Sequence, residues 1–481
     1  MDGRCKTRLP LVNPRLSGSA IQVNRQWMSG CYMSSLATPA TSTPSKGLKG
    51  TVKAPGDKSI SHRAIIFGAM AEGVTEVTDL LRGADILSTV GAMRSFGAKI
   101  TEDDKGTWRI EGVGAKGFSS PAEDVDCGNA GTGVRLIMGA AAGYKLSARF
   151  TGDASLSVRP MNRILDPLRE MGVSAEARTT EAGEPGRLPI SLQSSGALKP
   201  INYRPPHASA QVKSALLLAG LGSKGITTII EPVATRDHTE NMLRAFGVPV
   251  EVKTNSEGNH ISVTGPARLK ATKIKVPGDP SSAAFPIIAA LITPGSDILV
   301  ENVMMNPTRT GLFDTLNEMG AFLRADNFRK SGGETIADIH VKHSRLNGVT
   351  VPESRAASMI DEYPILAVAA AFATGKTLMK GIGELRVKES DRIAATTALL
   401  SENGVTVSET QDGMTVTGGA GKPPAGGGTI KTYHDHRIAM SALVLGLASK
   451  NPVRIDDAAM IATSFPTFFD LMASLGAHIE R

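Results

Sequence analysis

The sequence predicts an α/β protein of two domains, each built from three repeated units, and two observations carry this prediction. The first is an amphipathic helix that ends in glycine, followed by alanine or valine and then by β-type residues. This pattern returns six times, with the glycines 75, 75, 73, 84 and 72 residues apart, at Gly97, Gly172, Gly247, Gly320, Gly404 and Gly476. A glycine just past a periodic helix is the usual helix C-cap, and such regular spacing indicates repeated structural units.

The second observation is that each unit also contains an earlier helix made almost entirely of small and aliphatic residues. These helices are predicted to begin near Lys58, Asn129, Ser209, Asp279, Asp361 and Asp435. A helix that is apolar all round must be buried inside its unit. Each one nevertheless starts with a polar cluster, at the end where free N–H groups and the helix dipole attract anions.

The strongest internal match divides the chain in two. The stretches "VKAPGDKSISHRAIIFGAMA" and "IKVPGDPSSAAFPIIAALI" place Pro55 and Pro277 in equivalent positions, 222 residues apart. We therefore predict one domain over residues 58–277 and a second over 278–481, completed by residues 47–57. The two "PGD" segments would form a double crossover with a hinge, so that the domains close over a ligand in the cleft between them.

Residues 1–46 are set apart as a leader, disordered or non-native. They carry six basic side chains and one acidic one, which accounts for five of the seven net positive charges. Their Ser, Thr, Pro and Arg content fits a transit peptide or a disordered segment. Met28 and Met33 leave open a start of translation further downstream. The location predicted for the protein is the cytoplasm, or a plastid if the leader is a transit peptide.

Composition excludes several classes of protein. Cys127 is the single cysteine after residue 46, which excludes a disulfide framework there and favours a reducing compartment. The apolar run at 364–373 is too short to span a membrane, so a soluble protein is predicted. The chain after the leader has neither a basic stripe nor interleaved aromatic residues, which argues against nucleic acid as a partner. Small anions bound at a local site are the expected partners.

Several separate motifs together resemble one family. They are "PGDKSISHR" at 55–63, "GNAGTG" at 128–133, "HASAQVKSA" at 207–215, "RVKESDR" at 386–392 and "HDHR" at 434–437. Over about residues 47–481 the chain resembles the 5-enolpyruvylshikimate-3-phosphate synthases, in particular their bacterial class II. The resemblance implies an inside-out α/β barrel architecture, with two domains of three βαβαββ-like units each. It also implies transfer of the enolpyruvyl group of phosphoenolpyruvate to the 5-hydroxyl of shikimate 3-phosphate, with release of phosphate.

The resemblance also assigns residues to the two substrates. For shikimate 3-phosphate it implies Lys58, Ser59, Arg63, Ser209, Ala210, Gln211, Arg236, Asp361 and Lys388. For phosphoenolpyruvate it implies Lys58, Asn129, Gly131, Thr132, Arg159, Gln211, Arg392 and Arg437. Planar guanidinium groups suit such ligands because they grip a carboxylate or phosphate through two parallel hydrogen bonds.

Three residues are expected to carry the proton transfers. By resemblance, Asp361 takes the proton from the attacking 5-hydroxyl and Glu389 protonates the phosphoenolpyruvate methylene group. Lys58 is the second proton carrier and eases the loss of phosphate from a tetrahedral intermediate. The alternative for Asp361 is a plain helix cap. Some glyphosate-tolerant members of the class carry alanine where Gly131 stands, so we also predict sensitivity to glyphosate.

Metal catalysis is not expected. His434 and His436 lie two residues apart, and such residues do not share a helix face. The sequence shows no cysteine or spaced carboxylate set that would complete a site around them. The resemblance implies no metal, no organic cofactor and a monomer.

Two other functions stay open at this point. The sister enzymes that add enolpyruvate to UDP-N-acetylglucosamine share the repeats but typically carry a catalytic cysteine in a mobile loop. The corresponding loop here, "GDASLSVRP" at 152–160, has no cysteine. A phosphate-ligand-binding protein that has lost turnover is the second alternative, and the presence of Asp361, Glu389 and Lys58 argues against it.

Overall fold

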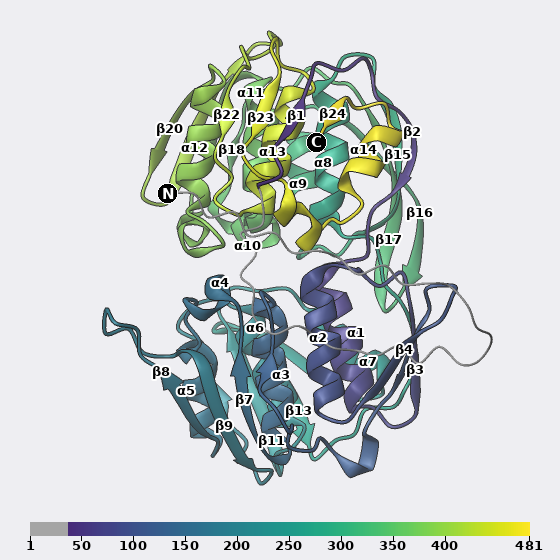
Figure 1. Ribbon diagram of the computed structural model, residues 1–481, viewed down its shortest axis with the longest axis vertical. Coiled ribbons are helices and arrows are strands. Elements are labelled where there is room, and N and C mark those ends of the chain that lie inside the picture. Colours follow the sequence, from purple (N-terminus) through teal and green to yellow (C-terminus); the bar gives the residue numbers. More distant parts are fainter. Residues whose placement is uncertain (1–36) are drawn as a thin grey trace, which may run out of the picture. The chain divides into compact units, whose positions relative to one another are not determined.

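Six buried helices form the interior of the protein. The computed structural model describes residues 37–481 (Figure 1). The buried helices are α1 (Lys58–Met70), α3 (Gly131–Ala142), α6 (Ala210–Gly220), α8 (Pro280–Ile292), α11 (Tyr363–Ala371) and α13 (His436–Gly446). All six begin within two residues of the predicted positions. Asp57, Ser209, Asp279 and Asp435 cap α1, α6, α8 and α13 by accepting a hydrogen bond from a backbone N–H of the first turn.

A second set of helices precedes the six repeated glycines. They are α2 (Ala84–Ser95), α5 (Asn162–Glu170), α7 (His238–Ala245), α9 (Gly311–Glu318), α12 (Arg392–Glu402) and α14 (Phe468–Ser474). Every repeated glycine has a φ between 80° and 105°, a conformation that a side chain would strain. The predicted C-caps are thereby confirmed.

Within residues 37–481 the strands form six four-stranded sheets; three take all their strands from one continuous stretch of chain, and the other three include one strand from a distant part of the chain. Three sheets belong to residues 58–277, here called the first half. Their strands, in spatial order, are β14 (Lys273–Lys275), β3 (Val74–Thr78), β5 (Trp108–Glu111), β4 (Lys99–Glu102); β6 (Val125–Asp126), β7 (Lys145–Thr151), β9 (Arg187–Ser195), β8 (Ser174–Arg178); and β10 (Asn202–Tyr203), β11 (Gly225–Glu231), β13 (Gly258–Gly265), β12 (Glu251–Asn255).

The other three sheets belong to residues 37–57 and 278–481, here called the second half. Their strands, in spatial order, are β2 (Lys49–Lys53), β15 (Asp297–Met304), β17 (Glu334–Lys342), β16 (Phe322–Ser331); β18 (Thr350–Val351), β19 (Thr374–Met379), β21 (Gly413–Gly419), β20 (Thr406–Thr410); and β22 (Thr429–Ile430), β23 (Val453–Ile455), β1 (Ala40–Ser42), β24 (Ile479–Glu480). The predicted α/β class is confirmed, and the six sheets agree in number with the six predicted repeats.

Short helical turns complete the connections between these elements. They are η1 (Gly114–Lys116), α4 (Ala154–Ser157), η2 (Glu353–Arg355), α10 (Ala356–Met359), η3 (Ile360–Glu362), η4 (Gly383–Val387) and η5 (Ala459–Thr463). Within residues 37–481, every helix is too short or too polar to cross a membrane.

The predicted leader, residues 1–46, includes residues that belong to the folded protein. Residues 40–42 form β1, which pairs antiparallel with β23 and β24 in the sixth sheet (Figure 1). This strand was missed because three residues are too few to show a period-two pattern. The remainder of the leader, residues 1–36, lies outside the described residues.

Each of the two halves has its own hydrophobic core. One consists of residues between 60 and 276 together with Met304, and the other of residues 40–54 and 283–477. In the second half α8, α11 and α13 pack against one another, and in the first half α3 packs against α1 and α6. The apolar helices therefore lie inside and the sheets outside, as expected for helices without a polar face.

The two "PGD" segments lie side by side between the halves. Gly56 and Gly278 form an antiparallel bridge, the Asp57 N–H donates to the Pro277 carbonyl, and the Asp279 N–H donates to the Pro55 carbonyl. Arg309 joins the two segments through ion pairs of 2.7 Å to Asp57 and 2.8 Å to Asp279. All three side chains are almost fully buried.

Candidate active site

Asp361 lies at the centre of a group of predicted arginines. Its carboxylate is 2.8 Å from Arg236 of the first half, 3.2 Å from Arg392 and 3.9 Å from Arg437. Arg437 also donates a hydrogen bond of 3.2 Å to the Asp361 carbonyl. The structure thus brings together four residues that lie up to 201 positions apart in the chain.

These positive charges decide the protonation state of Asp361. Burial on its own would raise the pKa, but Arg437, Arg236, Lys388 and Arg392 hold the pKa of this carboxyl well below its usual range. Asp361 is therefore ionised at neutral pH. The arginines around it already pair with its carboxylate, so a bound anion would have to share them with Asp361.

Arg392 is the most enclosed of these arginines. Its side chain is 1% exposed and makes ion pairs with Asp361, Glu389 and Asp435, the last at 2.7 Å. The pKa of Glu389 would be raised by burial, but Arg392, followed by His436 and Arg159, holds it well below its ordinary value. Asp435, the N-cap of α13, was not predicted from the sequence as a site residue, because its cap position already explains a carboxylate there.

Arg159 connects Glu389 with the glycine-rich segment. Its guanidinium is 3.8 Å from a Glu389 carboxylate oxygen and donates to the Asn129 side-chain oxygen at 2.9 Å. The Asn129 amide in turn donates to Asp153 at 2.8 Å. Gly131, the first residue of α3, lies beside this arginine.

Gln211 joins the starts of α3 and α6. Its amide N–H donates to the Thr132 hydroxyl at 2.9 Å, and its oxygen accepts from Arg135 at 2.8 Å. Burial and the neighbouring Arg159 lower the pKa of Arg135 to about 10. Arg135 was not predicted as a site residue, although it lies two positions after the "GNAGTG" motif.

Lys58, the first residue of α1, forms an ion pair with Asp85 of α2. Burial would raise the pKa of Asp85, but Lys58 beside it keeps the pKa below its usual value. Asp85 is an acidic residue in the first turn of a helix, a pattern that needs no functional explanation, so the sequence carries no signal for this pairing.

Arg63 is almost fully buried, and three neighbouring residues accept hydrogen bonds from its guanidinium. Its guanidinium donates to the hydroxyls of Thr239 at 2.7 Å and Ser214 at 2.8 Å, and to the Ser59 carbonyl at 3.0 Å. Burial lowers the pKa of Arg63 to about 10, and Glu240 partly opposes that effect. An arginine remains charged at such a value, so Arg63 is a fixed cation.

The remaining predicted residues are placed less tightly. Ser209 caps α6 by accepting from the Val212 N–H at 3.4 Å, and Ala210 is the first residue of that helix. Lys388 forms an ion pair of 2.9 Å with Glu384, and its charge contributes to the lowered pKa of Asp361.

The two histidines of "HDHR" lie in different surroundings. His434 lies outside the helix with its side chain largely exposed, 3.9 Å from Asp457, whereas His436 is buried as the first residue of α13. Burial lowers the pKa of His436 to about 3.

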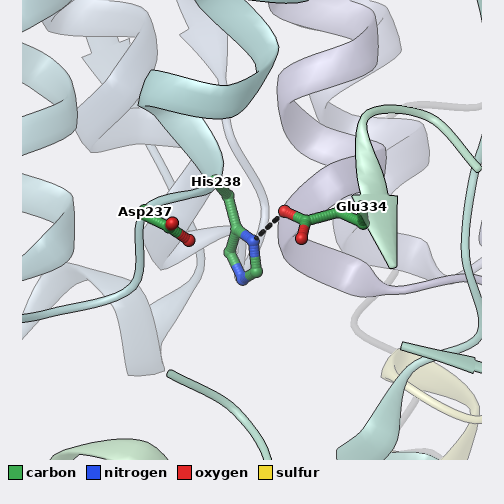
Figure 2. Close-up of side chains that lie close together, drawn as sticks. All are labelled: Asp237, His238 and Glu334. Atoms are coloured by element: carbon green, nitrogen blue, oxygen red, sulfur yellow. Dashed lines mark hydrogen bonds and ion pairs between the residues drawn. The ribbon is translucent and has the colours of Figure 1, made fainter. Parts of the chain in front are cut away.

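Among residues 37–481, another group, Asp237, His238 and Glu334, has the atom spacing of a metal site (Figure 2).

Known proteins resemble the chain over almost its whole length. The family model described as EPSP synthase (3-phosphoshikimate 1-carboxyvinyltransferase) matches residues 42–472. The chain belongs to the EPSP synthase family. The 3-phosphoshikimate 1-carboxyvinyltransferases of Chelativorans sp. (strain BNC1) and Phenylobacterium zucineum are each 58% identical to it over 443 residues, which is 92% of this chain and 98% and 96% of theirs.

Solved structures of the family agree with this membership. EPSP synthase from Acinetobacter baumannii is similar with a TM-score of 0.82 and 46% identity, covering 92% of this chain and 99% of that one. The enolpyruvyl transferase NikO from Streptomyces tendae shares the fold, with a TM-score of 0.70, 18% identity and coverage of 92% and 99%. The inside-out α/β architecture expected from the resemblance is thereby confirmed.

Membership in the EPSP synthase family establishes the reaction. The protein is an enolpyruvyl transferase of aromatic amino acid biosynthesis, and its substrates are phosphoenolpyruvate and shikimate 3-phosphate. This result favours the predicted function over both alternatives, the nucleotide-sugar enzyme and the non-catalytic binding protein. The relatives named here are bacterial, and they do not support the plastid alternative.

Proposed function

We propose that the reaction takes place around Asp361, with shikimate 3-phosphate on the side of the first half and phosphoenolpyruvate next to Arg392. The observation that carries this proposal is the arginine group around Asp361, because Arg236 reaches it from the first half and Arg392 and Arg437 from the second. Two phosphorylated substrates need such cations on both sides of the reacting atoms.

On the shikimate 3-phosphate side, we assign the phosphate to Ser59, Ser209, Ala210, Gln211, Arg236 and Lys388, and the carboxylate to Arg63. The fixed position of Arg63 supports this assignment, since its three hydrogen bonds leave the guanidinium little freedom. A cation fixed before binding loses little side-chain entropy when the ligand arrives.

On the phosphoenolpyruvate side, we assign Lys58, Asn129, Gly131, Thr132, Gln211, Arg159, Arg392 and Arg437. Two of these arginines contact Glu389, as Arg392 pairs with one of its oxygens and Arg159 lies 3.8 Å from the other. An incoming phosphate or carboxylate would compete with Glu389 for them.

We propose that Asp361 accepts the proton of the 5-hydroxyl as that oxygen bonds to C2 of phosphoenolpyruvate. The electron pair of the C2–C3 double bond takes a proton from Glu389, which gives a tetrahedral intermediate. The C2–O bond to phosphate then breaks, Lys58 supplies a proton to the departing oxygen, and the Glu389 carboxylate removes a proton from C3 to restore the double bond.

The charge state of Asp361 fits its proposed role directly, whereas that of Glu389 does not. Asp361 is ionised, as a base must be, whereas Glu389 is also ionised and has to gain a proton before it can donate one. Binding of an anion next to Glu389 raises its pKa, both by repulsion and by drawing Arg392 away. We therefore propose that phosphoenolpyruvate itself brings Glu389 to its acidic form.

We propose that residues 58–277 and residues 47–57 with 278–481 act as two domains that close over the substrates. The two hydrophobic cores support this division. We also propose a cytoplasmic monomer that uses no metal or organic cofactor, and inhibition by glyphosate at the phosphoenolpyruvate side.

The test of the reaction is phosphate release by the purified full chain. Phosphoenolpyruvate is supplied with shikimate 3-phosphate, with UDP-N-acetylglucosamine, or alone. We expect phosphate only with shikimate 3-phosphate, and release only with the nucleotide sugar would contradict the assignment.

The test of the site is Asp361→Asn, which keeps the size of the side chain and removes the base. We expect kcat to fall by about 10²- to 10⁴-fold, the range for losing a general base, while calorimetry still detects both substrates. Asp326→Asn, at an exposed carboxylate that pairs with Arg324, is the control and should keep its turnover. Near-normal turnover of Asp361→Asn would leave Asp361 a structural cap.

A further inference from the structure

Residues 236–239 are held by side chains of the second half. Figure 2 shows Asp237 and His238 at the start of α7, with Glu334 of β17 facing them. The ring Nδ1 of His238 and a carboxylate oxygen of Glu334 are 2.9 Å apart. His238 is fully buried and Glu334 is 3% exposed, so this contact lies out of water.

An amide group occupies the space between the two carboxylates. The side-chain N–H₂ of Asn306 donates to Asp237 at 2.7 Å and to Glu334 at 2.9 Å. The orientation of this amide is fixed, because its oxygen accepts from both the backbone N–H and the hydroxyl of Thr308. A cation at this position would have to displace the amide. The group is therefore a hydrogen-bond network in which donors already satisfy the carboxylates.

Glu334 needs these donors because it is a buried charge. Burial would raise its pKa, but the hydrogen bonds from His238, Asn306 and Asn241 keep the pKa below its usual value. An ionised buried carboxylate is stable only while its donors stay in place. The network therefore resists any shift of His238 away from Glu334.

The backbone around Glu334 is itself fixed against the first half. Glu334 follows the turn at Gly332 and Gly333, both of which have positive φ. The Ser331 hydroxyl of the same turn donates to the Lys275 carbonyl at 3.0 Å. A Cβ atom at Gly332 would lie 2.7 Å from that carbonyl, so the turn is seated closely on β14.

The segment held by this network carries two groups of the proposed shikimate 3-phosphate site. Arg236 directly precedes Asp237 and contacts Asp361 at 2.8 Å. Thr239 directly follows His238, and its hydroxyl accepts from Arg63 at 2.7 Å and donates to Ser214 at 2.7 Å. A displacement of His238 would therefore move both arginine contacts.

We infer that Glu334 is a positioning residue for shikimate 3-phosphate: it holds His238 directly and Asp237 through Asn306, and thereby fixes Arg236 and the Thr239 support of Arg63. This inference rests on the proposed roles of Arg236 and Arg63. Glu334 contacts no predicted substrate-binding side chain itself, so its effect is confined to the placement of the 236–239 segment.

The test is Glu334→Gln in the full chain. Glutamine keeps the size of the side chain but removes the buried charge, so its contacts with Asn306 and His238 change from charge-assisted to neutral hydrogen bonds, and His238 can accept from its N–H₂ only as the tautomer with an unprotonated Nδ1. We expect KM for shikimate 3-phosphate and its calorimetric dissociation constant to rise about fivefold or more, the effect of losing one charged hydrogen bond. KM for phosphoenolpyruvate and kcat should change by less than about twofold.

Asp338→Asn is the matched control. Asp338 lies on the same strand, and its carboxylate binds the Asn302 backbone N–H and Arg329, away from α7. This change should leave both KM values unaltered. Asn306→Ala is the second variant, which removes the Asp237 bridge and keeps the His238 pair, and we expect a smaller rise of KM in the same direction.

The outcomes separate the inference from the function on which it rests. No turnover by the unaltered protein would refute the reaction, whatever the variants do. With an active protein, unchanged shikimate 3-phosphate binding in Glu334→Gln would overturn the inference, and so would an equal change of both KM values and kcat. If Glu334→Gln does not fold, Asn306→Ala decides the question on the same criteria.

Discussion

Gly131 sets the space next to Arg159. A Cβ atom at this position would lie 2.8 Å from one Arg159 nitrogen and 3.3 Å from an Arg135 nitrogen. Both are ends of flexible side chains, so alanine is accommodated by a shift of the guanidinium groups. We predict that Gly131→Ala raises the glyphosate concentration for half-inhibition by about tenfold or more, the effect of one methyl group in a tight pocket.

Gly91→Ala is the matched control for this measurement. It adds the same methyl group in α2, where no atom of residues 37–481 lies within 4 Å of the new Cβ. Phosphate release at a series of glyphosate concentrations compares the three proteins. Equal inhibition of Gly131→Ala and the unaltered protein would show that the methyl group does not narrow the glyphosate site.

His62 is a buried histidine whose ring forms a hydrogen bond of 2.8 Å with the Thr89 hydroxyl. Burial lowers its pKa to about 3 from an ordinary value of 6.5. The unfolded chain therefore binds a proton below pH 6.5 that the folded protein does not, so stability from this residue is present above pH 6.5 and declines as the pH falls toward 3.

We predict that His62→Asn weakens this acid sensitivity. Between pH 7.5 and pH 5 the free energy of unfolding should fall by about 2 kcal/mol less in the variant than in the unaltered protein. Urea unfolding at both pH values measures the difference. His207→Asn, at an exposed histidine, should behave as the unaltered protein, and parallel losses in all three would argue against a neutral buried His62.

The charged residues of the proposed site were easier to predict from the sequence than the residues that position them. Asp361, Arg236 and Arg392 could be named because they stand in recognisable motifs at helix starts, and the structure places them together. Asp85 and Glu334 could not, since each looks like an ordinary polar residue at the start of an element. Their partners lie far away in the chain, and that proximity exists only after folding.

Among the elements, the buried helices were the most predictable part of the fold. A helix without a polar face and a glycine after a periodic helix are both local signals, and they located the helix starts to within two residues. Strand β1 and the two-residue strands β6, β10, β18, β22 and β24 give no such signal, because their pairing partners define them.

The contact between α3 and α6 depends on a missing side chain. A Cβ atom at Gly139 would lie 2.2 Å from the carbonyl oxygen of Ala215 and 2.6 Å from its Cα atom, and backbone cannot yield as a side chain can. We predict that Gly139→Ala destabilises the protein by about 1–3 kcal/mol through overpacking, although alanine favours helix formation.

The same substitution at Gly91 should have the opposite sign. Gly91 is an exposed position within α2 with open space around its Cβ, so Gly91→Ala should stabilise by roughly 0.5–1 kcal/mol. Urea unfolding of both variants measures the pair. Stabilisation by Gly139→Ala would mean that α3 and α6 can move apart without loss.

At the scale of the whole molecule, Arg309 joins the two chain crossovers. It pairs with both Asp57 and Asp279, and Ser281 also accepts a hydrogen bond from it at 2.8 Å. Arg309→Met fills similar space but leaves two buried carboxylates without a cation. We predict a loss of about 3–5 kcal/mol of unfolding free energy at pH 7.5, the usual effect of breaking a buried ion pair.

The pH dependence of this loss identifies its origin. Unpaired buried carboxylates take up protons more readily when folded than when unfolded, so their penalty shrinks as the pH falls. The deficit of Arg309→Met should therefore be smaller at pH 5 than at pH 7.5 in urea unfolding. Arg324→Met, which removes an exposed ion pair, should lose little at either pH. A deficit that does not vary with pH would indicate lost packing instead.

The position of β1 has a consequence for how the chain is made. Thr41 is opposite Glu480 in the sixth sheet, and Ser45 accepts a hydrogen bond from His478, which lies 433 residues further along. At ordinary rates of translation, roughly 20 to 90 s separate the synthesis of these partners. During that interval residues 58–277 have all their own strands available, whereas the sixth sheet still lacks its partner strands. Until residues 453–455 and 479–480 have been made, β1 therefore stays without the strands with which it pairs.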